Sequence, residues 1–204
     1  MAKGHEILQP LWVRICHWIH GISIVMLVVT GLQIRFPDVF VLFPSLKSTV
    51  HLHNFFGFLV LFDFLIWYFL YVLKRELVRQ YIPSKKDLVD IPEYANYYFV
   101  RYFFGDPHPF HPTPQAKFNP LQKTAYFGIM FFMLPLQIIT GLLLWDMQTF
   151  RPIIEAVGGV RVVDAVHIIV AYIFGAFLIV HLYLSTLGHT FFAHFKAMIL
   201  GYED

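Results

Sequence analysis

Four apolar stretches, each long enough to cross the hydrocarbon core of a membrane, constrain this chain more than any other feature. They cover roughly residues 11–34, 50–73, 126–145 and 160–187, and a transmembrane helix needs about 20 mainly apolar residues. Because 58% of the residues are hydrophobic and only 14% are charged, the composition excludes a soluble domain. We therefore expect one all-α integral membrane domain over residues 1–204, built on a four-helix transmembrane bundle.

Lysine and arginine are spread unevenly over the connections between these spans. The second connection, residues 74–123, contains eight of them, whereas the first contains two and the third contains only Arg151, with Arg161 at the start of the fourth span. The positive-inside rule therefore places the second connection and both termini in the cytoplasm. Since the first span also carries Arg14 and two histidines, we do not expect a cleavable signal peptide.

The fourth span carries two histidines, His167 and His181, fourteen residues apart. At about 100° and 1.5 Å per helical residue, they lie within about 40° of one face and about 21 Å apart along the axis. Ionisable side chains inside a membrane helix are costly and mark functional sites. Imidazole is the commonest side-chain metal ligand and a frequent axial ligand of haem iron. The pattern therefore predicts a helix that holds one haem in each half of the membrane.

Two axial ligands of one haem must come from different helices at the same depth. With the orientation above, His53 in the second span lies at the depth of His167, near the outer side. His17 in the first span lies at the depth of His181, near the cytoplasm. We expect His53 and His167 to ligate an outer haem. We expect His17 and His181 to ligate an inner haem.

Two alternative ligands stay open at this point. His20 lies three residues after His17, on the same face but one turn deeper. His51 lies two residues before His53 and points about 160° away from it. We favour His17 and His53, because His20 is displaced in depth and only one of the second span's two histidines can face the bundle.

Two further residues are expected to contact the haems. Gly57 follows His53, and a small residue beside a ligand lets a macrocycle approach the backbone. Phe174 is seven residues from both His167 and His181, which places it on the same helical stripe, midway between them. We expect Phe174 to fill the gap between the two macrocycles and to contact at least one haem edge.

The second connection and the tail are expected to lie at the cytoplasmic surface. The connection predicts one short amphipathic helix around residues 91–104, followed by a Pro-rich segment. His108 and His111 stand between prolines without a cysteine or carboxylate cluster, so we interpret them as solvated loop residues and not as metal ligands. The tail containing His189 and His194 predicts an interfacial amphipathic helix.

The start and the middle of the third span carry their own signals. Asn119 followed by Pro120 is typical of a helix N-cap with proline at the first helical position. Capping does not exclude ligand binding by Asn119 or Gln122, so both interpretations are kept. Pro135 and Gly141 predict a kink and close packing, and therefore a supporting role for this span.

Several motifs together resemble the gamma, cytochrome b subunit of membrane-bound formate dehydrogenase. The related subunits of thiosulfate reductase and nickel–iron hydrogenase share the broader pattern. The motifs are RxCHW in the first span, HxFFG in the second, H-x13-H-L-Y in the fourth, and IPSKKD and NPLQK on either side of the second connection. The resemblance extends over nearly the whole chain, and the four histidines match the four ligand positions of that group.

This resemblance implies a bundle with two b haems, in the cytoplasmic membrane of a bacterium or archaeon. It implies that an iron–sulfur subunit and a catalytic subunit with molybdenum, tungsten or nickel–iron dock on the outer side. Electrons would pass between those partners and a quinone, menaquinone or ubiquinone, near the cytoplasm. The residues that match the quinone pocket of the group are Asn119, Gln122 and His181. Lipid is the other expected partner, and nucleic acid is not expected.

The chain itself has no set of residues for substrate chemistry. It contains one cysteine, Cys16, no nucleotide-binding loop and no acid–base pair, so that chemistry must lie on partner chains. The leading hypothesis is a membrane anchor and electron-transfer subunit of a respiratory complex. A stand-alone di-haem oxidase, such as a superoxide:quinone oxidoreductase, is the second hypothesis. A haem-free transporter with four separately satisfied histidines is the third.

Overall fold

A computed structural model describes residues 7, 9–107, 109–110, 112–113, 115–187 and 192–202. Every regular element in this part of the chain is helical. Four helical runs are long and apolar enough to cross a membrane, which confirms the all-α membrane fold expected from the sequence. They are α1 (Leu11–Arg35), α2 (Leu46–Leu73), the continuous run Pro120–Trp145, and α8 (Val160–Ser185). The expectations for His108, His111 and His189 lie outside the described residues.

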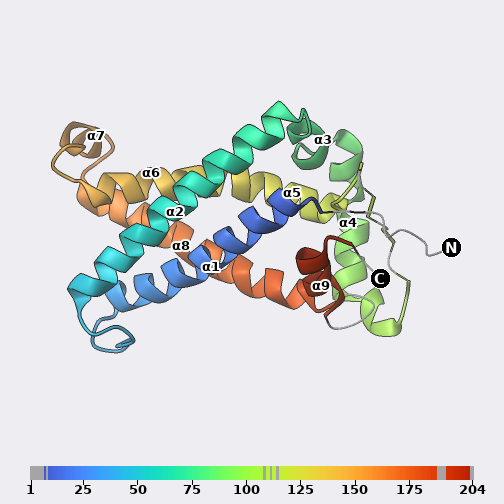
Figure 1. The fold of residues 1–204 in the computed structure, drawn as a ribbon, viewed down its shortest axis with the longest axis horizontal. Coiled ribbons are helices and arrows are strands. Elements are labelled where there is room, and N and C mark those ends of the chain that lie inside the picture. The colour runs from blue at the N-terminus through green and yellow to red at the C-terminus, as the bar shows by residue number, and fades with distance from the viewer. Residues whose placement is uncertain are drawn as a thin grey trace.

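The four spans lie side by side, and the short elements gather at the two ends of the bundle (Figure 1). One end carries α7 (Arg151–Ala156) and the loop 36–45 between α1 and α2. The other end carries the remaining short helices, namely α3 (Leu77–Tyr81), α4 (Lys85–Phe99), the 3₁₀ turn η1 (Arg101–Phe104) and α9 (Ala193–Leu200). The charge distribution predicts that the α7 end is the outer end, and the two ends are named outer and inner accordingly.

The third span begins six residues earlier than its apolar stretch, at Pro120 instead of residue 126. It consists of α5 (Pro120–Gly128), a π-helical segment η2 (Ile129–Met133) and α6 (Leu134–Trp145). Pro135 has no N–H to donate to the preceding turn, and the wider π turn directly before it accommodates this loss. The irregularity predicted at Pro135 therefore takes the form of a π segment.

Capping residues explain why two other helices also begin early. Ser45 caps α2 in a reciprocal capping box with Ser48, so the helix begins at Leu46 instead of residue 50. Ser84 caps α4 in the same way with Asp87, so the helix begins at Lys85 and not near residue 91. Polar caps lie outside the apolar stretch, and hydropathy alone therefore places these helix starts too late.

The outer loop is held by one buried side chain. Gln33, which is 4% exposed, donates from its amide nitrogen to the carbonyl of Phe43 at 3.0 Å. Its amide oxygen accepts from the backbone N–H groups of Leu42 and Phe43, both at 2.9 Å. These three hydrogen bonds fix the loop against the end of α1.

The tail helix α9 packs on the first turns of α1. The indole N–H of Trp18 donates to the carbonyl of Met198 at 3.1 Å, and the rings of Trp18 and Phe195 meet edge to face. The guanidinium of Arg14 donates to the carbonyl of Ile199. Phe195 and Ile199 of α9 are each about half exposed. Exposed apolar side chains are expected on a helix that lies at a membrane interface.

Candidate functional site

The four predicted ligand histidines form two pairs across the bundle. In the outer pair, His53 of α2 faces His167 of α8, with ring centroids 6.4 Å apart and ring planes at 68°. In the inner pair, His17 of α1 faces His181 of α8, with centroids 6.1 Å apart and planes at 51°. The structure thus brings together the residues that the sequence analysis paired by depth.

These separations fit a metal ion held between two imidazoles. A metal–imidazole bond is about 2.0–2.1 Å long, and the ring centre lies about 1.1 Å behind the nitrogen, so two opposed ligands place their centroids about 6.3 Å apart. Within the described residues, no group of three or more His, Cys, Asp or Glu could hold a metal. A metal between two imidazoles alone needs its other ligands from elsewhere, and the macrocycle of haem supplies them.

The two alternative histidines are not part of either pair. His20 Nδ1 lies 3.2 Å from a carboxylate oxygen of Asp63, a residue of α2 that is 5% exposed. His51 is exposed at the start of α2. Among the described residues, neither ring lies opposite a second histidine, which favours His17 and His53 on geometry.

Two threonines lie against the outer pair in the same manner. Thr30 Oγ1 of α1 lies 2.8 Å from His53 Nδ1. Thr140 Oγ1 of α6 lies 2.9 Å from His167 Nδ1. Both threonines are buried, at 0% and 5% exposure. The sequence alone does not single them out, although the two spans without the outer pair each carry a Thr-Gly pair, which is a readable signal.

The glycine of each Thr-Gly pair lets the imidazole lie close to a helix backbone. A Cβ added at Gly31 would lie 3.5 Å from His53 Cε1, and one at Gly141 would lie 3.3 Å from His167 Cε1. Gly57, expected to admit a macrocycle beside His53, differs from these: a Cβ there would meet no atom within 4 Å. Open space beside His53 and close packing behind both imidazoles are compatible with a large planar group.

The inner pair has a different surrounding. His17 Nδ1 is buried and has no hydrogen-bond partner among the residues that the structure describes. The ring of His181 stacks on Phe177, with centroids 5.8 Å apart and planes at 22°. A buried imidazole nitrogen without a partner is costly in a membrane helix, and a bound metal held by this ring would offset that cost, which supports a ligand role for His17.

An apolar core separates the two pairs. Phe174, at 5% exposure, packs with the buried side chains of Val60, Leu134 and Val170. The side chain therefore points into the bundle, midway along α8 between His167 and His181, and not toward lipid. The expected contact between Phe174 and a haem edge stays a prediction.

Asn119 and Gln122 form the capping box at the start of the third span. Asn119 Oδ1 accepts from the N–H of Gln122 at 2.9 Å, and Gln122 Oε1 accepts from the N–H of Asn119 at 3.2 Å. The remaining amide N–H of Asn119 donates to the hydroxyl of Tyr98 at 3.0 Å. Asn119 is 1% exposed, so its structural role is established, and a quinone-binding role for the two residues stays a prediction.

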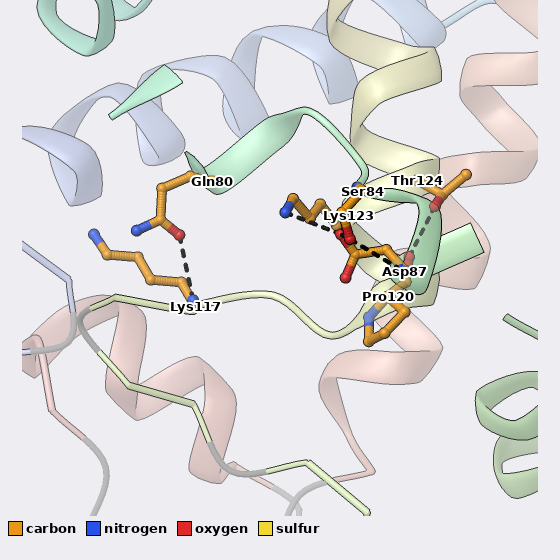
Figure 2. Close-up of polar contacts among 7 residues, drawn as sticks. All are labelled: Gln80, Ser84, Asp87, Lys117, Pro120, Lys123 and Thr124. Carbon is orange, nitrogen blue, oxygen red and sulfur yellow. Dashed lines mark hydrogen bonds and ion pairs between the residues drawn. The ribbon is translucent and has the colours of Figure 1, made fainter. Parts of the chain in front are cut away.

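A cavity of about 210 Å³ lies beside this capping box, between α3, α4 and the start of α5. Lys123 and Asp87 form an ion pair of 3.1 Å at its wall, and Gln80 accepts from the backbone N–H of Lys117 close by (Figure 2). Burial raises the pKa of the Asp87 carboxyl, but hydrogen bonds from Ser84 and Lys123 outweigh it and hold the pKa below its usual value. The wall of the cavity therefore carries fixed charge.

A series of aromatic rings connects this cavity with the inner pair. Phe118 lines the cavity, and its ring centroid lies 4.9 Å from that of Tyr126. Tyr126 lies 6.3 Å from Phe177, and Phe177 stacks on His181. The cavity and the inner histidine are thus linked through three rings in contact.

The sequence profile of the prokaryotic cytochrome b561 family matches residues 8–201, and the chain belongs to this family. It is therefore a membrane haem protein of electron transfer, with haem b as the cofactor of the family. The chain is also 34% identical over 192 residues to a protein of Escherichia coli (strain K12) named "Putative cytochrome YdhU", covering 94% of this chain and 72% of that protein. Neither match reaches the narrower group of formate dehydrogenase subunits, which stays a prediction.

Proposed function

We propose that this chain is the di-haem membrane anchor and electron-transfer subunit of a respiratory oxidoreductase. The observation that carries the proposal is the presence of two histidine pairs at different depths, each at a separation suited to one metal. His53 and His167 are the proposed ligands of the outer haem. His17 and His181 are the proposed ligands of the inner haem.

The haem irons would supply one-electron chemistry, and the chain's own residues control where it occurs. The two ligands on α8 lie about 21 Å apart along the helix axis, so an electron can pass between the two halves of the membrane. Phe174 and its apolar neighbours fill the space between the pairs and exclude water, which would otherwise alter the environment of both sites.

An iron–sulfur subunit is the proposed partner at the outer end, together with a catalytic subunit that binds molybdenum, tungsten or nickel–iron. The described residues provide no cysteine cluster for such chemistry. The loop held by Gln33 exposes four consecutive apolar side chains, at 39% to 75% of their surface; they are Val39, Phe40, Val41 and Leu42. A rigid apolar loop at the outer end is the surface on which we place the iron–sulfur subunit.

The inner cavity is the proposed site of a quinone head group. Its volume of about 210 Å³ is smaller than the roughly 300–1,000 Å³ of pockets for drug-sized ligands, so the isoprenoid tail would remain outside. The rings between Phe118 and His181 offer a contact path for electrons from the inner pair. Asn119 and Gln122 would shape the cavity by holding the start of α5.

Optical spectroscopy of the purified chain tests the haem assignment. We expect about two low-spin b haems per chain with bis-histidine ligation, and His181→Ala should remove the inner haem and leave the outer one. Absence of a Soret band would contradict haem binding, and loss of neither haem in the variant would contradict the pairing. Copurification tests the subunit role: a lone chain that oxidises a donor and reduces quinone would favour a stand-alone oxidase.

Quinone turnover tests the inner cavity. Asn119→Ala and Gln122→Ala should slow quinone reduction while both haems remain bound. Loss of an N-cap costs about 1 kcal/mol on its own, so Ser45→Ala, which removes a capping box at the outer end of α2, serves as the matched control. Normal turnover in both cavity variants would show that the quinone binds elsewhere.

A further inference from the structure

The threonine hydroxyls beside the outer pair accept hydrogen bonds from the histidines. Each hydroxyl has one proton, and a backbone carbonyl one turn earlier takes it: Thr30 Oγ1 lies 2.6 Å from the Met26 oxygen, and Thr140 Oγ1 lies 2.8 Å from the Leu136 oxygen. A threonine that donates to its i−4 carbonyl has only lone pairs left to offer. The bond to each imidazole therefore runs from Nδ1–H to the threonine oxygen.

This direction fixes the tautomer of both outer histidines. A neutral imidazole with its proton on Nδ1 presents a lone pair at Nε2. At His167 that lone pair already accepts a hydrogen bond, because the amide nitrogen of Gln137 lies 3.1 Å from Nε2. With the proton on Nδ1, Nε2 is the nitrogen whose lone pair a metal would take, at His167 in place of the Gln137 amide, and at His53 in the same way.

The inner pair lacks these hydrogen bonds. His17 Nδ1 is buried, and no described residue offers it a hydrogen bond. In the part of the chain that the structure describes, His181 makes ring contacts with His17 and Phe177 and no side-chain hydrogen bond. The two pairs therefore differ in a property that controls how strongly an imidazole donates electrons.

We propose that Thr30 and Thr140 are positioning residues that lower the reduction potential of the outer haem. A hydrogen bond from Nδ1–H makes the imidazole more basic. A stronger donor stabilises ferric over ferrous iron, and hydrogen bonding around the axial ligands is one of the protein's means of setting a haem potential. The two hydroxyls would thus favour passage of an electron from the outer to the inner haem. The inference rests on the proposed haem ligation.

Redox titration of four variants of the full chain tests this role. Thr30→Val and Thr140→Val keep the shape of the side chain and remove the hydroxyl, whereas the corresponding serine variants keep it. Each valine variant should shift the outer haem toward the reduced form by about three- to tenfold, where tenfold corresponds to 59 mV for one electron. The inner potential should stay unchanged, and serine should restore the outer one.

A matched control and an independent assignment separate the possible failures. Thr49 is equally buried and donates to a backbone carbonyl at 2.9 Å, but within the described residues its hydroxyl makes no hydrogen bond to a histidine, so Thr49→Val should move neither potential. The outer haem is assigned as the one retained in His181→Ala. If that variant does not lose one haem, the proposed ligation is wrong, and the hydroxyl effect fails with it.

The remaining outcomes decide the inference directly. Unchanged outer potentials in both valine variants, with both haems bound, would overturn it. Loss of the outer haem in the valine variants but not in the serine variants would support a positioning role, because only the hydroxyl differs in that comparison. If the serine variants also lost the outer haem, the positioning role of the hydroxyls would be overturned. The low-spin electron paramagnetic resonance signal of the ferric outer haem should also change in the valine variants and not in the Thr49 control.

Discussion

His20 Nδ1 lies 3.2 Å from the carboxylate of Asp63, between α1 and α2 and one turn from His17. Asp63 is an acidic residue in the middle of a membrane span, at 5% exposure. A buried carboxylate needs a partner, and His20 provides it. The two histidines of the first span therefore have separate tasks: His17 faces His181, and His20 satisfies Asp63.

We predict that haem content separates these two tasks. His17→Ala should remove one of the two haems, because His17 is the proposed ligand, whereas His20→Ala should leave both in place. The pyridine haemochrome assay on purified protein measures the ratio of haem to chain. If only the His20 variant lost a haem, His20 and not His17 would be the haem ligand on α1.

A second prediction concerns the stability of the Asp63 contact. Asp63→Leu leaves the partly buried nitrogen of His20 without a partner, which costs up to about 1–3 kcal/mol, whereas Asp63→Asn keeps a polar partner and should cost less. Thermal unfolding in detergent should show the larger drop in midpoint for the leucine variant. Equal midpoints for the two variants would mean that the hydrogen bond contributes nothing measurable.

The long apolar stretches and the helical period were sufficient to predict the bundle and the pairing of its histidines. Residues such as His167 and His181 lie in regular helices, where spacing converts directly into direction and depth. The roles of Thr30 and Thr140 could not be derived in this way. A threonine in a membrane helix ordinarily bonds to its own backbone, and only the packing of α1 on α2 and of α6 on α8 places the hydroxyls against histidines.

Short elements were predicted less well than long ones. The helices α3 and α7 have five and six residues, which is too few for a periodic pattern. The helix around 91–104 was expected to be single, but it begins at Lys85, and residues 101–104 form a 3₁₀ turn. Capping side chains and local aromatic packing decide such boundaries, and neither contributes to hydropathy.

A third prediction uses the two glycines behind the outer pair. A Cβ at Gly141 would lie 3.3 Å from the ring of His167, closer than ordinary contact, whereas one at Gly31 would lie 3.5 Å from His53. Gly141→Ala should therefore displace the imidazole of His167. It should shift the spectrum of the outer haem more than Gly31→Ala does. Gly175→Ala, where a Cβ would meet no atom within 4 Å, is the control. All three variants gain about 0.5–1 kcal/mol of helix propensity, so a loss of stability in Gly141→Ala alone would reflect the contact.

A fourth prediction concerns acid sensitivity at the inner end. The pKa of Asp87 is held below its usual value by Ser84 and Lys123, so the folded protein favours the ionised form. The resulting stability is complete above the usual carboxyl pKa and is lost as the pH falls through the lowered value. Asp87→Asn should remove that acid-dependent loss and lower stability near neutral pH by about 1 kcal/mol or less. Melting curves between pH 7 and pH 3 measure both effects, and a variant with the same acid profile as the parent chain would contradict the assignment.

The last prediction concerns Phe174, the aromatic residue between the two pairs. Its ring is buried among Val60, Leu134 and Val170, so Phe174→Ala leaves a cavity and should cost about 3–5 kcal/mol of stability. Phe62, on α2, is 58% exposed, and Phe62→Ala should cost far less because no packed core is lost. Since the loss of the ring removes the packing between the two sites, we also expect both haem potentials to move in the Phe174 variant and neither in the Phe62 variant. Similar behaviour of the two variants in unfolding and in redox titration would mean that Phe174 does not fill the space between the haems.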